Sequence, residues 1–361
     1  ICHTAVSVHD KGVAMSLLTY SGITTKVRAM ESRLFTEEQF REMAALEDVH
    51  SAADYLKQQP AYAGIFSGLD DSMLHRGNIE RLLTLSLYRD FASLYRFGSL
   101  KQRRFLDLYF MHYEIDIMKR ALRHVYSKQP AEMDLSEFRE FFEKHSSIDL
   151  VALSQSESLE EFLSSLKGSI YYDLLAGLAE NGKCSSFDYE LQLDLFYFKS
   201  LWKIKNKILS KKELKILDEC FGSKIDLLNI QWMYRSTQYY HLPAADIYSL
   251  LIPIRYRLKP EQINRMAETS TREEFLAAAS QTVYGNLANT FLQKNPDADG
   301  LYRQIMARIY STAGRKNPYS IAILNSYLFF KEREMHRIIT ILEGIRYGLS
   351  ASEIEGLAAK Q

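Results

Sequence analysis

The sequence predicts an all-α fold, and three observations point to it. Strand-like alternation of apolar and polar residues is almost absent. The seven prolines leave long uninterrupted windows, as helices require. Near the end of the chain, apolar residues recur at steps of three, four or seven, which places them on one face of a single helix: Leu328, Met335, Ile338, Leu342 and Ile345.

The composition is that of a globular protein with a sizeable core. Of the 361 residues, 47% are hydrophobic and 25% are charged. Lys plus Arg and Asp plus Glu both number 45, so no overall basic surface is present and we expect no nucleic-acid partner. The three cysteines lie far apart and the nine histidines lack ligand spacing, so we expect neither a metal site nor a cofactor.

No stretch of the sequence predicts a membrane span. The densest apolar run, IYSLLIPI at 247–254, is far shorter than the roughly 18 residues that a span needs. We therefore expect a cytoplasmic protein, or one that sits on a membrane through its partners.

An internal repeat of about 110 residues organises the chain. The segments 34–66, 148–175 and 258–287 each have an apolar pair, a middle rich in Glu, Asp and Ser, an aliphatic helix and a terminal tyrosine. Aligning the three segments equates Tyr62, Tyr172 and Tyr284, at offsets of 110 and 112 residues.

A second set of segments falls in phase with the first: 113–123, 224–235 and 331–342. In each, an acid precedes a polar or basic residue by three positions, and the acids are offset by 110 and 108 residues. The pairs are Asp116 with Lys119, Asp226 with Asn229, and Glu334 with Arg337. Two landmarks with one period predict three homologous helical bundles, 1–125, 126–237 and 238–361.

Two interpretations of these six residues stay open. They can line a surface that contacts a partner, or they can be i,i+3 partners and caps that hold each bundle together. Repetition in every unit favours the structural interpretation, since a single partner would not meet all three units identically.

Two further charged segments are candidate contacts. Arg28 and Arg33 flank Glu31 and can bind a partner or cross-link bundles. The segment KIKNKILSKKELK, 203–215, carries six lysines. Such a run usually faces water, but it can also meet an acidic protein surface or lipid headgroups.

The stretch GLAENGKC, 177–184, matches seven places of the nucleotide-binding P-loop, G-x-x-x-x-G-K-[ST]. A P-loop follows a strand, whereas Leu163, Leu166, Ile170, Leu174 and Leu178 keep helical spacing up to this motif. Cys184 stands where a hydroxyl would bind Mg²⁺, and a thiol is a poor ligand for that cation. We interpret the stretch as a helix end closed by Asn181 and Gly182.

The tripled pattern resembles the C subunit of the V-type (A-type) rotary ATPases, which is similar to the d subunit of the eukaryotic V-ATPase. The resemblance runs from about residue 20 to about residue 355. It rests on KVRAMESRLFTEEQF (26–40), YFMHYEIDIMKRALR (109–123), GSKIDLLNIQWMYR (222–235) and the segment 325–354, in which a charged helix runs into I-x-x-G-x-x-x-G-L-S.

The resemblance implies a funnel of three pseudo-symmetric helical bundles and a protein without an active site. Its partners would be the rotor-shaft subunits and the membrane proteolipid ring, on the cytoplasmic face of the membrane. We expect the isolated chain to be a monomer. Two alternatives remain: a helical-repeat scaffold of another complex, and a nucleotide-dependent enzyme built on GLAENGKC.

Overall fold

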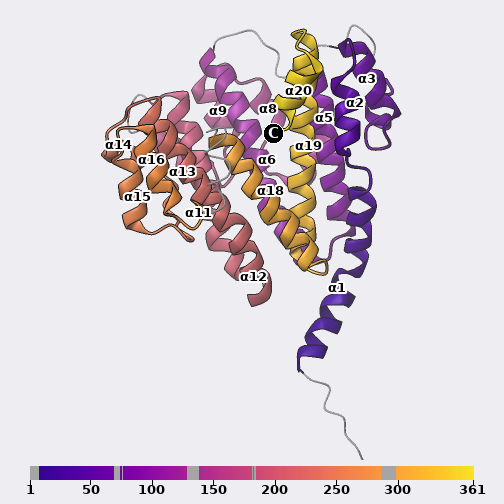
Figure 1. Ribbon diagram of the computed structural model, residues 1–361, viewed down its shortest axis with the longest axis horizontal. Helices are drawn as coiled ribbons and strands as arrows, with labels where there is room; N and C mark the ends of the chain where they lie inside the picture. The colour runs from indigo at the N-terminus through magenta and orange to yellow at the C-terminus, as the bar shows by residue number, and fades with distance from the viewer. Residues whose placement is uncertain are drawn as a thin grey trace, which may run out of the picture. The chain divides into compact units, whose positions relative to one another are not determined.

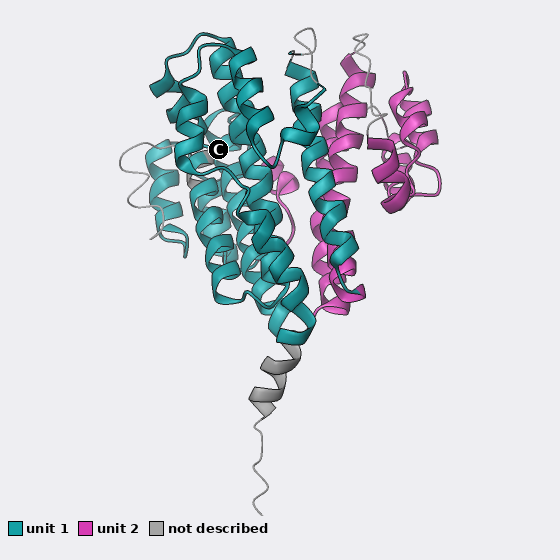
Figure 2. Ribbon diagram, turned by 90° about the vertical axis from the view of Figure 1, so that its right-hand side faces the viewer, with its two compact units in different colours: residues 1–99, 211–244, 256–361 teal, residues 100–210, 245–255 magenta. Residues whose placement is uncertain are grey.

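A computed structural model describes residues 8–68, 74, 76–127, 138–180, 182, 184–285 and 298–361. Every regular element within these ranges is a helix, which confirms the all-α prediction (Figure 1). The chain forms two compact units, coloured separately in Figure 2. The division into three bundles stays a prediction.

The larger unit contains residues 1–99, 211–244 and 256–361. Its helices are α1 (Val8–Glu31), α2 (Glu37–Ala44), α3 (Val49–Gln58), α4 (Ala63–Phe66), α5 (Arg76–Phe97), α12 (Lys211–Leu217), the π-helix η3 (Asp218–Gly222), α13 (Ser223–Gln238), α15 (Pro260–Ala267), α16 (Arg272–Ser280), α18 (Ala298–Lys316), α19 (Ile321–Arg346) and α20 (Ala351–Ala358).

The smaller unit contains residues 100–210 and 245–255. Its helices are α6 (Leu100–Ser127), α7 (Arg139–His145), α8 (Leu150–Ser154), α9 (Leu159–Ser165), α10 (Tyr172–Glu180), α11 (Ser186–Ile208) and nearly all of α14 (Ala244–Leu250). The two long helices α6 and α11 pack against each other more extensively than any other pair of helices described in this unit.

Helix α19 organises the core of the larger unit. It packs against α1, α2, α5, α18 and α20. Of the five apolar residues predicted to share one face, four are buried and Met335 is partly buried, which confirms that prediction. Their neighbours in the core include Phe40 and Met43 of α2, and Leu56 of α3.

The helix predicted to lead into GLAENGKC is interrupted. Helix α9 ends at Ser165, turns follow, and α10 begins at Tyr172. Gly168 has φ +87° in these turns, and Ile170 is 61% exposed although its spacing placed it on the helix face. A helix nevertheless reaches Glu180, and Gly182 has a positive φ, as expected for a helix end. Asn181 lies outside the described residues.

The motif I-x-x-G-x-x-x-G-L-S is a tight reversal between α19 and α20. A Cβ on Gly344 would lie 2.6 Å from a side-chain carbon of Ile354, so only glycine permits this approach. Gly348 has φ +68°, and the amide of Leu349 donates to the carbonyl of Gly344 at 3.0 Å, closing the helix. Ser350 then caps α20.

We expect Gly348→Ala and Gly356→Ala to change stability in opposite directions. An alanine at Gly348 must adopt the left-handed region, which costs about 1 kcal/mol. Gly356 lies inside α20 with open space around it, so alanine there stabilises the helix by roughly 0.5–1 kcal/mol. Chemical denaturation of both variants measures the two effects. Equal destabilisation by both would contradict the assigned conformations.

Candidate partner-binding residues and three buried carboxylates

Glu334, on α19, is buried among donors from three places in the chain. One carboxylate oxygen accepts the hydroxyl of Tyr62 at 2.5 Å and the ammonium of Lys331 at 2.9 Å. The other oxygen accepts the backbone amide of Phe35 at 2.5 Å. Because Lys331 is only 1% exposed and also donates to the Tyr62 hydroxyl, this is a closed internal network.

Asp226, on α13, is fully buried and accepts four hydrogen bonds. Three come from consecutive backbone amides, of Tyr256 at 3.1 Å, Arg257 at 2.6 Å and Leu258 at 3.1 Å. The fourth comes from the hydroxyl of Tyr284 at 2.9 Å. Burial raises the pKa of Asp226, while these hydrogen bonds act to lower it. The carboxylate therefore fixes the backbone that leads into α15.

Glu114, on α6, occupies the corresponding place in the smaller unit. Its oxygens accept the hydroxyl of Tyr171 at 2.5 Å and the hydroxyl of Ser146. Burial raises the pKa of Glu114, and the two hydrogen bonds only partly oppose this effect.

The three carboxylates share one architecture. A long helix presents an acid to the tyrosine that closes a short helix–turn–helix segment. Glu114 and Tyr171 are 57 residues apart, and Asp226 and Tyr284 are 58 apart. Glu334 instead accepts from Tyr62, 272 residues earlier, because the last long helix, α19, packs against the first short helical segment. This contact joins the two ends of the described chain.

The structure corrects the predicted register of the repeat by two residues in α6 and by one at the tyrosine. Asp116, expected to be equivalent to Asp226 and Glu334, is half exposed and faces His112 at 3.6 Å. Tyr172, expected to match Tyr62 and Tyr284, is half-buried, whereas Tyr171 holds the carboxylate.

The physical reason for the error lies in helix geometry. Positions two apart on a helix point about 200° apart, so Glu114 and Asp116 lie on different faces. Glu114 shares its face with Ile117, Met118 and Ala121, all of them buried. These apolar residues three, four and seven positions after Glu114 indicate a buried face in the sequence. An alignment of acids by their offset alone does not take this spacing into account.

The residues predicted three positions after each acid also have partners within the chain. Lys119 donates to Asp194 of α11 at 2.5 Å. Arg337 donates to both carboxylate oxygens of Glu37, at 2.6 and 2.8 Å, and its guanidinium lies 3.7 Å from the ring centroid of Phe40. Asn229 is 1% exposed on α13. These contacts favour the structural interpretation of the six residues.

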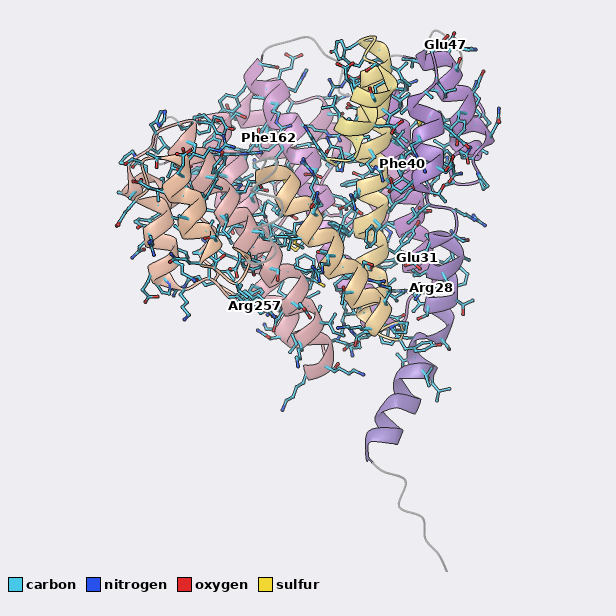
Figure 3. The ribbon with its side chains drawn as sticks, in the orientation of Figure 1. Arg28, Glu31, Phe40, Glu47, Phe162 and Arg257 are labelled. Atoms are coloured by element: carbon cyan, nitrogen blue, oxygen red, sulfur yellow. The ribbon has the colours of Figure 1, made fainter. Side chains whose placement is uncertain are left out.

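The other charged candidates lie mainly at the surface. Arg28 is exposed and pairs with Glu31 at 2.9 Å on α1, where both are labelled in Figure 3. Arg33 is exposed just beyond the same helix. In the lysine run, five side chains are exposed, whereas Lys205 is buried 3.4 Å from the ring centroid of Trp202. The solvated-surface interpretation therefore fails for Lys205 alone.

The geometry also bears on metal binding and on membrane insertion. Within the described ranges, no group of three or more His, Cys, Asp or Glu side chains is placed to hold a metal ion. The same part of the chain contains no helix that is both long and apolar enough to cross a membrane.

The fold and these sites define an all-helical protein in which long helices hold buried carboxylates against short helical segments. A family model of the ATP synthase (C/AC39) subunit matches residues 23–357, so the chain belongs to this family. This confirms the family predicted from the repeats.

Three relatives share one description, that of the C subunit of an A-type ATP synthase. The protein from Thermococcus kodakarensis is 26% identical over 346 residues, which cover 93% of this chain and 89% of that protein. The protein from Haloquadratum walsbyi is 25% identical over 353 residues, covering 92% and 96%. The protein from Thermococcus onnurineus is 25% identical over 365 residues, covering 99% and 94%.

We expect Asp226→Asn to destabilise the protein far more than Asp116→Asn. Asn replaces one acceptor oxygen of Asp226 with an NH₂ group, which would face a backbone N–H and leave it without an acceptor. We expect this to lower the unfolding free energy by roughly 2–3 kcal/mol. Asp116 is half exposed beside His112, so its replacement changes stability by less than about 0.5 kcal/mol. Urea denaturation of both variants measures the difference. Equal effects would restore the register predicted from the sequence.

Glu114 gives a pH dependence of known sign. Its pKa is raised in the folded state, so folding takes up a proton and this carboxyl lowers stability as pH rises from its unfolded pKa through its folded pKa. Glu114→Gln removes the titration. We therefore compare the unfolding free energies of the variant and the natural chain at each pH. Their difference, variant minus natural chain, should increase from about pH 4, near the usual pKa of a glutamate, to about pH 7. A difference independent of pH would contradict a raised pKa.

Proposed function

We propose that this chain is a non-catalytic part of the central stalk of a rotary V/A-type ATPase. In this role it couples the rotor shaft to the membrane proteolipid ring, on the cytoplasmic face, during ion transport or ATP synthesis. The observation that carries the proposal is the family match over residues 23–357. Relatives described as the C subunit of an A-type ATP synthase align with this chain along most of their lengths, which supports the proposal.

The internal architecture supports a mechanical role. A part that transmits torque must resist deformation, and packed helices with interlocked side chains are stiff. The clusters around Glu334 and Asp226 add buried hydrogen bonds that tie a long helix to loops far away in sequence. Such networks specify one arrangement of the helices, because any slip leaves a carboxylate unsatisfied.

The division between buried and exposed charges supports a proposal for where partners bind. Asp226 and Glu334 use their carboxylate oxygens inside the chain, and Arg337 uses its two terminal nitrogens there, so we assign these residues to holding the fold. Arg28 and Arg33 lie at the surface, and charged groups at the rim of an interface steer association and set specificity. We propose that these two arginines contact another protein of the ATPase.

The decisive experiment mixes the full chain separately with purified rotor-shaft subunits and with the detergent-solubilised proteolipid ring. We expect a stable complex with each, measured by size-exclusion chromatography and interferometry. The double variant Arg28→Glu, Arg33→Glu should weaken one of the two complexes by about tenfold or more, as expected for reversed interface charges.

Arg139→Glu is the matched control for that experiment. Arg139 is also an exposed arginine in an ion pair within one helix, with Glu143 at 2.6 Å, and it lies in the smaller unit. Its replacement should leave both complexes unchanged. If the folded natural chain bound neither the shaft nor the ring, the coupling role would be rejected and a scaffold of another complex would replace it.

A further inference from the structure

Several helix ends of the larger unit meet the middle turns of α1. The hydroxyl of Tyr20, on α1, donates to Glu213 in the first turn of α12. One turn further along α1, the hydroxyl of Thr24 donates to the carbonyl of Pro318, between α18 and α19, at 2.8 Å. Helix α1 also packs along α5. Figure 1 shows α12 and the junction of α18 with α19 ending on the same side of this unit, beside α1. The surface formed there, which we name the basic end, comprises residues 17–26, 93–99, 211–215 and 312–321.

Positive charge is concentrated in the basic end although the whole chain is neutral. Lys plus Arg and Asp plus Glu both number 45 in the chain, whereas the four segments of the basic end contain seven basic residues and one acid. That acid, Glu213, is only 5% exposed and accepts the hydroxyl of Tyr20, so it lies beneath the surface. The basic end therefore attracts anions. Its basic residues, all exposed except the half-buried Lys26, are Lys26, Arg96, Lys211, Lys212, Lys215, Arg315 and Lys316.

Large apolar side chains stand exposed among these cations. Leu18, on α1, is 83% exposed, and Phe97, the last residue of α5, is 59% exposed. Leu17 and Tyr319 are exposed to smaller extents, 38% and 41%. The ammonium of Lys26 lies 5.1 Å from the ring centroid of Phe97, which holds a cation and an aromatic ring side by side. The basic end thus combines positive charge with apolar groups that water solvates poorly.

This combination fits a lipid surface better than an acidic protein surface. Protein interfaces gather their apolar residues in a central core and place charges at the rim. In the basic end, Leu18 and Phe97 come from different helices and lie among basic residues. At a membrane surface the two kinds of side chain work together, because ammonium groups reach the headgroups while apolar side chains pass between them. Five of the seven cations are lysines, whose compact charge on a flexible stem suits mobile headgroups.

We propose that the basic end binds the surface of an anionic lipid bilayer. Lys211, Lys212 and Lys316 meet the headgroup phosphates, and Leu18 and Phe97 enter the boundary between headgroups and acyl chains. The contact is peripheral, since the part of the chain that the structure describes contains no helix long and apolar enough to cross a membrane. The inference does not rest on the coupling role, because a membrane of lipid alone contains neither a rotor shaft nor a proteolipid ring.

The test is co-sedimentation of the full chain with lipid vesicles. One set contains phosphatidylglycerol and phosphatidylcholine in equal parts, and the other contains phosphatidylcholine alone. We expect the chain to bind the anionic vesicles and to stay in solution with the neutral ones. Binding should weaken as the salt concentration rises, because salt screens the attraction between lysines and headgroups. If the folded chain bound neither set at low salt, the proposal would be rejected.

Reversing two lysine charges tests the electrostatic part. We expect the double variant Lys211→Glu, Lys212→Glu to bind anionic vesicles about tenfold or more weakly. Both residues are exposed in the first turn of α12, where the helix dipole favours a negative charge, so this variant should fold. The matched control is Arg41→Glu, Lys360→Glu, which makes the same change in net charge. These two exposed residues belong to α2 and to the end of the chain after α20, and Figure 1 shows both helices beyond the opposite end of α1. The control should bind like the natural chain, and circular dichroism verifies the fold of each variant.

Replacing an exposed leucine separates a lipid surface from any other polyanion. Leu18→Ser should weaken binding to anionic vesicles by roughly fivefold, because the apolar insertion is lost, and its exposed position leaves the fold intact. Leu357→Ser is the control, since Leu357 is an exposed leucine on α20. If Leu18→Ser bound as tightly as the natural chain, the basic end would be a general polyanion site and the lipid assignment would be rejected. Binding to the proteolipid ring without binding to vesicles would likewise reject it, while leaving the coupling role supported.

Discussion

The structure depends on carboxylates buried on long helices and satisfied by distant parts of the chain. Taking an ionised carboxylate out of water is costly unless hydrogen bonds or an opposite charge replace the lost solvation. Glu334 and Asp226 each meet this requirement with donors from loops that precede short helices. Each acid therefore sets the register between a long helix and a loop, because no other alignment supplies the donors.

The three carboxylates meet the same requirement by different chemistry. Glu334 has a buried lysine, and Asp226 has three consecutive backbone amides. Among the described residues, Glu114 accepts hydrogen bonds from two hydroxyls, neither of them charged. Burial raises the pKa of both Glu114 and Asp226, and in each case the hydrogen bonds oppose this effect only in part. The repeat thus keeps one geometry within the chain and varies its electrostatics.

The sequence was sufficient for the fold class and for the buried face of α19. These follow from spacing, which helix geometry converts directly into a face. The register within α6 did not follow, because Glu114 and Asp116 differ by two positions and only packing decides which one is buried. The partner of Glu334 was also beyond local pattern, since Tyr62 lies at the other end of the chain.

Burial also decides which charged residues remain available for other molecules. Asp226 accepts four hydrogen bonds, so a partner would have to break the fold to reach it. Arg337 is also held within the chain, because Glu37 takes one fork of its guanidinium, Phe40 covers a face, and Nε is buried. Arg28, by contrast, is exposed on α1, where it pairs with Glu31. That distinction is made by hydrogen-bond geometry, and neither residue type nor spacing in the sequence expresses it.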